Sequence, residues 1–381
     1  MSVREESVTS NNCIENNKVY GRYSMGGGQR LSDPDKLFYK IDDSEIIESY
    51  KLSMNHDIER AGIPKDKFNN YEVLDVGTGR QAIALYLLGA KKVKHYDISP
   101  NQVERMKSYI ESNSLQDRLE THCVDLVNYS LPRNSFDFVY LHGIVQHFSH
   151  TGLGLRNCMQ AVKKGGYLWL YFYRSGTFAN FVVYLLRDLF NRSAVDHREL
   201  YINSMILRCD GCKPNAFVSS IMDNLFVTYS NLYSAKSYIS FVNDCGFEIT
   251  FSSRLDPIGK EVDHKYASPT VILVCKKVED RELSQCDVEI LSPGKNVNQL
   301  DSQIYTQSIH KEIIQTINDY NSLKQALLLN NIPKSFISSL AIKILDYVKN
   351  FNNADPDNRH KYLQNIFNNT RQLIKEEFVS I

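Results

Sequence analysis

A glycine turn and three aspartates are the residues whose types and spacing best suit ligand chemistry. The sequence VLDVGTG contains Asp75, Gly77 and Gly79, and Asp97 and Asp125 stand at the ends of later apolar segments. Glycine lets a chain turn tightly and lets a ligand approach the backbone closely. A carboxylate at a strand end accepts hydrogen bonds from ribose hydroxyls or from an amine. The combination therefore predicts a site for a nucleoside that carries a cationic group.

Short apolar segments alternate with helical patterns around these residues. The segments that we expect to be strands are Glu72–Val76, Val93–Asp97, Leu119–Asp125, Phe136–Leu141 and Gly166–Tyr173. The helical patterns are Arg80–Ala90, a helix that begins at Pro100 after the N-cap Ser99, and Leu153–Val162. This alternation predicts a parallel sheet with helices on both faces. Ligands bind at the carboxyl ends of the strands in such sheets.

The pattern changes after the fifth strand. Residues 174–233 form an insertion with aromatic helical patches, which we expect either to cap an acceptor pocket or simply to pack onto the sheet. A helix at Ala235–Cys245 and strands at Phe247–Ser253 and Thr270–Lys276 follow. The predicted fold is α/β and doubly wound, with a mostly parallel seven-stranded sheet that ends in an antiparallel pair. The predicted regions are an N-terminal tail and lid (1–70), a central domain (71–280) and a helical C-terminal extension (281–381).

The glycine turn alone allows a second interpretation. Gly77–Ala82 also fits the dinucleotide pattern G-x-G-x-x-G/A. Three features oppose it: Asp75 would face a pyrophosphate, Asp125 adds an acceptor suited to a nucleoside amine, and the sheet ends in an antiparallel pair instead of a second βαβ half.

Five motifs in order carry a family resemblance. VLDVGTG, HYDIS, CVDL, FDFVYLHGIVQHF and VKKGGYLWLYF resemble the motifs of class I, Rossmann-type S-adenosylmethionine-dependent methyltransferases. The resemblance is strong over residues 71–173 and weaker over 234–278. It implies S-adenosylmethionine as the cofactor. The sequence departs from the family pattern at Gln81, where a third glycine is common, which puts the local pose of the loop in doubt.

The resemblance also implies roles for single residues at each part of the cofactor. The implied contacts are Asp75, Gly77 and Gly79 around the methionine part, Asp97 at the ribose hydroxyls, Ile98 against the adenine, Asp125 at the adenine amino group with Leu126 nearby, and His142 and Gly143 near the sulfonium.

Methyl transfer from a sulfonium requires little catalysis by the protein, because the methyl group is already activated: the thioether leaves as a neutral group. The protein must hold the acceptor atom in line with the methyl group. A base is needed only when the acceptor arrives protonated. His147 and His142 flank the end of the fourth strand and are the candidate catalytic bases, with packing or capping as the alternative role of each. Arg174 either clamps an anionic substrate or is a surface residue at a strand end.

Composition limits the partners. The 381 residues contain 44 Lys+Arg and 44 Asp+Glu, so the formal net charge is zero. A tight nucleic-acid binder usually carries a basic excess, so we expect no nucleic-acid partner. No run approaches the roughly 18 apolar residues of a membrane span. Eight cysteines without a dense framework suit a reducing cytoplasm. We therefore expect a cytoplasmic protein.

Three further features leave alternatives open. Tyr20 and Tyr23, beside a Gly-rich patch, suit a closing lid or a disordered tail. Cys209 and Cys212 form a lone C-x-x-C motif without a second ligand pair, so we expect no metal site. Apolar residues at helical spacing in the C-terminal extension suit core packing or contacts in a homo-oligomer.

The favoured function is methylation of oxygen or nitrogen on a small or medium-sized metabolite. A small-molecule methyl acceptor is therefore the expected partner. One alternative is methylation of protein or RNA, which predicts a basic, open surface beside the strand ends. The other is a non-catalytic cofactor-binding or scaffold protein, which fits Gln81 and the lack of a decisive base.

Overall fold

The computed structural model describes residues 44–175, Thr177, Asn180, 229–253, Leu255, 270–281 and 288–293. The chain divides into two compact units, of which one comprises Met1–Arg174, Val227–Val262 and Thr270–Val297. All described residues except Ser175, Thr177 and Asn180 belong to that unit. The predicted lid with Tyr20 and Tyr23, most of the insertion, Cys209 and Cys212, and the C-terminal helices lie outside the described residues.

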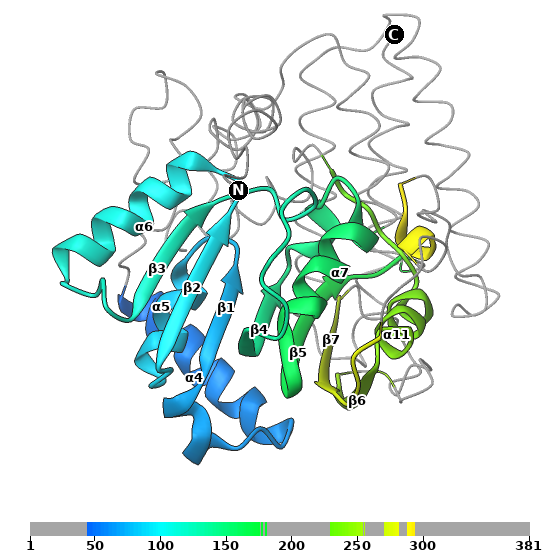
Figure 1. The fold of residues 1–381 in the computed structure, drawn as a ribbon, viewed down its shortest axis with the longest axis horizontal. Helices are drawn as coiled ribbons and strands as arrows, with labels where there is room; N and C mark the ends of the chain where they lie inside the picture. The colour runs from blue at the N-terminus through cyan, green and yellow to red at the C-terminus, as the bar shows by residue number, and fades with distance from the viewer. Residues whose placement is uncertain are drawn as a thin grey trace, which may run out of the picture. The chain divides into compact units, whose positions relative to one another are not determined.

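Seven strands form one sheet in the order β3-β2-β1-β4-β5-β7-β6 (Figure 1). Their bounds are β1 Glu72–Val76, β2 Lys92–Asp97, β3 Leu119–Cys123, β4 Phe136–His142, β5 Val162–Tyr173, β6 Phe247–Ser252 and β7 Thr270–Lys277. The first five strands pair in parallel, whereas β7 pairs antiparallel with both β5 and β6. The predicted seven-stranded sheet with a terminal antiparallel pair is confirmed.

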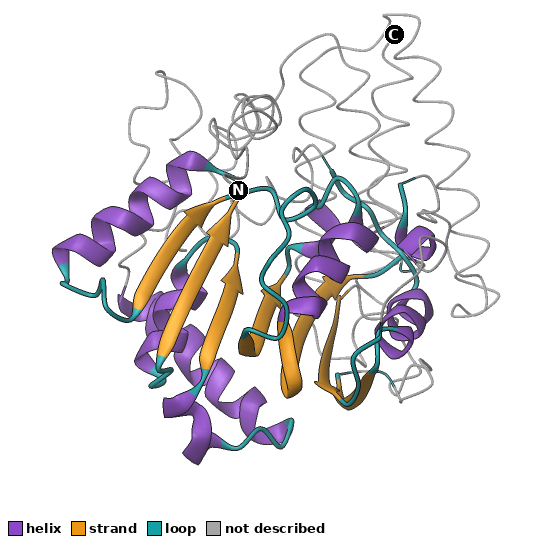
Figure 2. Cartoon of the chain, viewed as in Figure 1, coloured by secondary structure: helices purple, strands orange, loops and turns teal. Residues whose placement is uncertain are grey.

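Helices cover both faces of this sheet (Figure 2). The α-helices are α4 Ser44–Arg60, α5 Arg80–Leu87, α6 Pro100–Ser112, α7 Thr151–Ala161 and α11 Ala235–Asp244; short 3-10 helices are η2 Lys65–Asn70, η3 Val145–His147 and η4 Glu289–Leu291. Val73 and Phe138 share a core with α4, α5 and α6. Their neighbours Leu74 and Val139 share the other core with α7 and α11. Successive strand residues point to opposite faces, so central strands covered on both sides must be apolar throughout.

The strand order indicates where on the sheet a ligand should bind. From β1 the chain winds to β2 and β3 on one side, and it then returns to β4 and β5 on the other side of β1. The winding thus reverses between β1 and β4. In open α/β sheets ligands bind outside the carboxyl ends of the strands at such a reversal. The turn after β1 and the loop after β4 are therefore the segments that should meet a ligand.

Two predicted boundaries differ from the structure by three residues or more. Strand β5 begins at Val162 and not at Gly166, because Val162 already pairs with Phe136 before an irregularity brings Tyr167 opposite Phe138. Helix α5 ends at Leu87 and not at Ala90, because Gly89 leaves the helical conformation with φ 100°. The predicted Ser99 position before α6 is confirmed, although its side chain makes no capping hydrogen bond.

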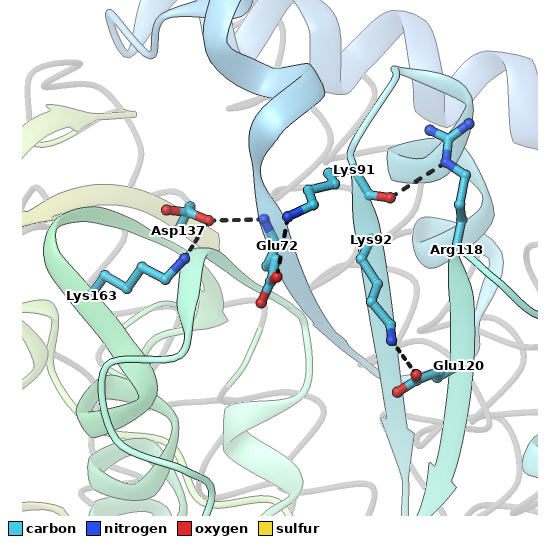
Figure 3. Close-up of polar contacts among 7 residues, drawn as sticks. All are labelled: Glu72, Lys91, Lys92, Arg118, Glu120, Asp137 and Lys163. Carbon is cyan, nitrogen blue, oxygen red and sulfur yellow. Dashed lines mark hydrogen bonds and ion pairs between the residues drawn. The ribbon is translucent and has the colours of Figure 1, made fainter.

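Polar contacts tie together the amino ends of the strands, opposite the ligand edge (Figure 3). The Asp137 carboxylate accepts hydrogen bonds from the Glu72 backbone N–H and from Lys163 Nζ, both at 2.9 Å. This carboxylate therefore joins the starts of β1, β4 and β5. Lys92 and Glu120 form an ion pair between β2 and β3. Partly exposed pairs of this kind contribute at most about 1 kcal/mol each.

Lys277 is a buried cation at the end of β7. Its Nζ donates to the Val162 carbonyl at 2.8 Å and to Asn134 Oδ1 at 2.9 Å, and it pairs with Asp280 at 2.7 Å. The side chain is 5% exposed. These contacts join the antiparallel end of the sheet to the start of β5.

We expect Lys277→Met to lower the free energy of unfolding by about 2–4 kcal/mol, because it leaves the buried Val162 carbonyl without its donor. Lys276→Met is the matched control, since Lys276 is the exposed neighbour on the same strand; it should cost less than about 1 kcal/mol. Urea denaturation measures both. Equal losses for the two variants would contradict this account.

Candidate functional site

The turn between β1 and α5 depends on two glycines. Gly77 has φ 136° and Gly79 has φ 85°, both in the region that side-chain-bearing residues rarely adopt. Gly79 is also the N-cap residue of α5, and its carbonyl accepts the Ile83 N–H at 3.1 Å. The Gly77 N–H donates to the Tyr96 carbonyl at 3.1 Å. The backbone can therefore reverse directly from the strand into the helix at the ligand edge.

Gln81, where the family pattern often has a glycine, takes part in this turn. Thr78 Oγ1 donates to Gln81 Oε1 at 3.2 Å, and the Gln81 residue is 8% exposed. The larger side chain is thus held against the turn by a polar contact, and α5 begins normally at Arg80.

Asp75 is buried between the sheet and α5. It is 1% exposed, and neither carboxylate oxygen makes a side-chain hydrogen bond to any residue that the structure describes. Burial and, second, the nearby negative charge of Asp97 raise the pKa of Asp75 to about 8, and the Ala82 backbone N–H offsets only part of this. A cationic group placed beside Asp75 would relieve both effects.

Asp97 and Ile98 end β2, next to the glycine turn. Asp97 Oδ1 accepts the Ser99 backbone N–H at 2.6 Å, which fixes the carboxylate at the start of α6. Asp97 and Ile98 are both half-buried. The electrostatic effect of Asp97 on Asp75 shows that the structure brings these two predicted residues together.

Asp125 follows β3 and holds its own loop. Oδ1 accepts the Val127 N–H at 3.0 Å and Oδ2 accepts from Asn128 Nδ2 at 2.7 Å. Leu126 is 3% exposed and its side chain packs into the core on the α7 face. A ligand would therefore meet the Leu126 backbone sooner than its side chain. The roles of Asp125 and Leu126 at the adenine stay predictions.

His142 lies in a group of aromatic rings at the end of β4. Its ring stacks on Tyr171 with centroids 4.4 Å apart, and its Nδ1 contacts the Tyr140 hydroxyl at 2.9 Å. Burial, followed by the charge of Asp75, raises the pKa of Tyr140 well above its usual value, so the phenol keeps its proton and donates it to Nδ1. Burial lowers the pKa of His142 to about 4. A histidine held neutral in this way is a weak proton acceptor near neutral pH.

His147 has a different environment at the end of η3. Its Nδ1 lies 2.9 Å from the Tyr229 carbonyl, which can only accept, so Nδ1 carries the proton. The lone pair of Nε2 then accepts from Gln146 Nε2 at 3.2 Å. Gln146 also donates to the Gly143 carbonyl at 2.7 Å. The imidazole therefore has a fixed tautomer with its basic nitrogen on the side opposite Tyr229.

The sequence assigns no role to three contributors to this site, although two of them, His95 and Gln146, lie within the quoted motifs. Gln146 is fully buried, and Asn231 holds the loop after β4 through its N–H to the Gln146 carbonyl and its Nδ2 to the Phe148 carbonyl, both at 2.8 Å. His95 lies beneath the glycine turn. Only His95 leaves a signal, as a polar residue two positions after the buried Val93 and therefore on the same face of β2.

The family comparison follows this geometry. Residues 74–170 match the family model described as a methyltransferase domain. The match spans the turn after β1, the ends of β2 and β3, and the loop after β4. Residues 74–170 are a class I S-adenosylmethionine-dependent methyltransferase domain. No curated protein matches the chain in sequence.

Solved structures resemble the chain at low identity. Phosphoethanolamine N-methyltransferase 1 of Haemonchus contortus is 15% identical over 77% of this chain and 55% of that chain, with a TM-score of 0.44. A Pyrococcus horikoshii protein is 16% identical over 65% of this chain and 96% of that one, with a TM-score of 0.38. The cyclase SpnF is 18% identical over 42% of this chain, with a TM-score of 0.31, and the chain spans 59% of its length. The family match and the strand order carry the assignment.

The structure corrects the interpretation of Arg174 as a surface residue. Arg174 is 6% exposed and forms a parallel bridge with Tyr233, so it is not the surface residue that its place at a strand end suggested. Its alternative role as a clamp for an anionic substrate stays a prediction.

The described residues contain neither a metal-binding cluster nor a membrane-spanning helix. No cluster of three or more His, Cys, Asp or Glu side chains there could hold a metal ion. None of the helices in that part of the chain combines the length and apolar character needed to cross a membrane.

The raised pKa of Asp75 predicts a pH-dependent stability for the ligand-free domain. The folded state keeps the Asp75 proton up to about pH 8, whereas the unfolded state releases it near pH 4. The contribution of this proton to the free energy of unfolding is therefore complete below pH 4 and is lost as pH rises through 8. Asp75→Asn removes this dependence. Relative to Asp75→Asn, wild type should lose up to about 1.4 kcal/mol per pH unit between pH 4 and 8.

Urea denaturation from pH 5 to pH 8 measures this difference. Asp117→Asn, which changes an exposed carboxylate, is the matched control. A difference between wild type and Asp75→Asn that is constant with pH would show that the Asp75 carboxyl is ionised in the folded protein.

Proposed function

We propose that this protein transfers a methyl group from S-adenosylmethionine to an oxygen or nitrogen atom of a small or medium-sized metabolite. The observation that carries the proposal is the position of Asp75 and Asp97 on neighbouring strands beside the turn at Gly77–Gly79. This arrangement lies within the region that matches the methyltransferase family.

The three parts of the donor suit three different groups of the site. The ammonium of the methionine part is a cation that none of the described residues supplies to the buried Asp75, and the glycine turn leaves room for the backbone of the methionine part. The Asp97 carboxylate can accept from both ribose hydroxyls while it keeps the Ser99 N–H, because each of its oxygens has two lone pairs. Asp125 retains the same spare capacity for the adenine amino group.

The chemical step requires little more than alignment. A lone pair on the acceptor attacks the methyl carbon, the carbon–sulfur bond breaks, and its electron pair stays on sulfur as a neutral thioether. An acceptor that arrives as a hydroxyl or an ammonium must also lose a proton. We assign that proton to His147 Nε2, because the Tyr229 carbonyl orients the ring with its lone pair on this nitrogen. The acceptor must replace the Gln146 amide, which donates to the same lone pair at 3.2 Å.

His142 has a different role in this proposal. Its low pKa and its stacking on Tyr171 suit a neutral wall beside the sulfonium better than a base. Aromatic faces attract a cation without accepting a proton from it. His142 is therefore proposed as a cofactor contact, and His147 as the base.

The balanced charge favours a small acceptor over a nucleic acid. With 44 basic and 44 acidic residues, the chain offers no overall positive field for phosphates. A small-molecule acceptor, a cytoplasmic location and self-association through the C-terminal helices complete the proposal.

Binding of S-adenosylhomocysteine tests the donor. We expect wild type to bind it in calorimetric titration and Asp97→Ala to weaken binding at least tenfold, because two charge-assisted hydrogen bonds to the ribose are lost. Asp244→Ala, at the end of α11, is the control and should bind as wild type does. Absence of binding by wild type, or undiminished binding by Asp97→Ala, would overturn the proposal.

Replacement of His147 tests the base. His147→Gln should lower the rate of methyl transfer by about 10²–10⁴-fold, the usual contribution of a positioned base, and should leave the affinity for S-adenosylhomocysteine within twofold. His56→Gln, on the exposed side of α4, should change neither quantity. An unchanged rate in His147→Gln would show that the acceptor reacts without this base.

A further inference from the structure

We propose that His95 is a positioning residue that holds the cofactor-binding turn in shape by fixing the carbonyl group of Gly77. The inference rests on the proposed function, because it concerns the turn that is to meet S-adenosylmethionine. None of the methyltransferase motifs in the sequence assigns a role to this side chain.

The contacts of His95 run from β3 to the turn. His95 is on β2, pairs in register with Asp75 on β1, and is completely buried. Its Nε2 lies 2.5 Å from the Gly77 carbonyl oxygen, and its Nδ1 lies 2.8 Å from Thr121 Oγ1 on β3. One imidazole thus connects three consecutive strands of the parallel sheet at their carboxyl ends.

The proton positions follow from the partners. A carbonyl oxygen only accepts, so Nε2 must carry the proton and donate it to Gly77. The neutral ring then has a lone pair on Nδ1, which accepts a hydrogen bond from the Thr121 hydroxyl. Burial lowers the pKa of His95 to about 4, which keeps the ring in this neutral form. The Gly77 carbonyl therefore selects the tautomer, and the Thr121 hydroxyl satisfies the other ring nitrogen and holds the ring in place.

The turn needs such a contact because little else fixes Gly77. A side-chain carbon built on Gly77 would meet no atom of the described residues within 4 Å, so none of them packs against Gly77 on that side. Glycine also has the greatest backbone freedom of any residue. The Gly77 N–H continues the pairing with β2, whereas its carbonyl is held by His95. These two hydrogen bonds determine the peptide orientation from which Thr78 and Gly79 continue.

A purely structural role for His95 predicts a different pattern of effects. Any buried hydrogen-bonding side chain is destabilising to remove, so a loss of stability alone does not identify a positioning residue. Lys277 supplies the comparison, because it is equally buried and bonded but joins β7 to β5 away from the turn. A positioning residue must change cofactor affinity by more than its effect on stability explains.

The test combines two readouts on four variants. Calorimetric titration with S-adenosylhomocysteine gives the affinity, and amide hydrogen exchange of residues 77–82 gives the order of the turn without any ligand. The variants are His95→Leu, His95→Gln, Thr121→Val and the control Lys277→Met. All measurements are made well below the unfolding temperature of each variant, on the full chain.

We expect His95→Leu to weaken binding about tenfold, the effect of one lost buried hydrogen bond, and to speed exchange at residues 77–82. His95→Gln keeps an N–H donor and should recover part of the affinity. Thr121→Val should weaken binding several-fold, since the buried Nδ1 loses its hydrogen-bond donor and the ring is held less firmly against the Gly77 carbonyl. Lys277→Met should lower stability and leave both readouts at their wild-type values. Thr121→Val and His95→Gln decide the matter if His95→Leu does not fold.

Two results would overturn the inference. One is wild-type affinity and wild-type exchange in the folded His95 and Thr121 variants. The other is an equal loss of affinity in Lys277→Met, which would make the effect one of general stability. If wild type itself does not bind S-adenosylhomocysteine, the proposed function fails, and the exchange of residues 77–82 alone still decides whether His95 holds the turn.

Discussion

Asp75 is a carboxyl group that the fold buries without a cation from any residue that the structure describes. Burial and, second, the charge of Asp97 raise its pKa to about 8. An arrangement of this kind costs stability in the free protein. A ligand that brings the compensating positive charge would recover this free energy on binding. The proposed site therefore has to hold the cationic group of its ligand at one fixed place.

The rest of the fold supplies that fixed place. The reversal of winding between β1 and β4 brings the glycine turn and the loop after β4 to the same edge of the sheet. The two apolar cores fix the strands from both faces, so the ends of β1, β2 and β4 have little freedom. Contacts from distant segments then set the local details: His95 at the turn, and the Tyr229 carbonyl at His147.

The strands and helices follow from patterns within a few residues, which is why they can be predicted from the sequence. Leu74 and Val139 lie between two layers of helices, and their apolar runs record that burial. The start of β5 could not be predicted, because Val162–Gly165 join the strand only through pairing with β4, and the local sequence there is polar.

The site divides in the same way. The order of the motifs predicts Asp75, Gly77 and Asp97 as site residues, and the structure brings them together. The distinction between His142 and His147 could not be made from the sequence. It depends on stacking with Tyr171 in one case and on a carbonyl 82 residues away in the other. Chain separation of that size leaves no local pattern, and the same holds for the contact of His95 with Thr121 across β2 and β3.

The central claim is that the chain moves a methyl group to a small molecule, and one assay tests it directly. The purified protein is incubated with S-adenosylmethionine that carries a labelled methyl group and with a cell extract separated by size into small molecules, protein and nucleic acid. The account predicts label in the small-molecule fraction, above that found with Asp97→Ala. Label confined to protein or nucleic acid, or no transfer into any fraction, would contradict it.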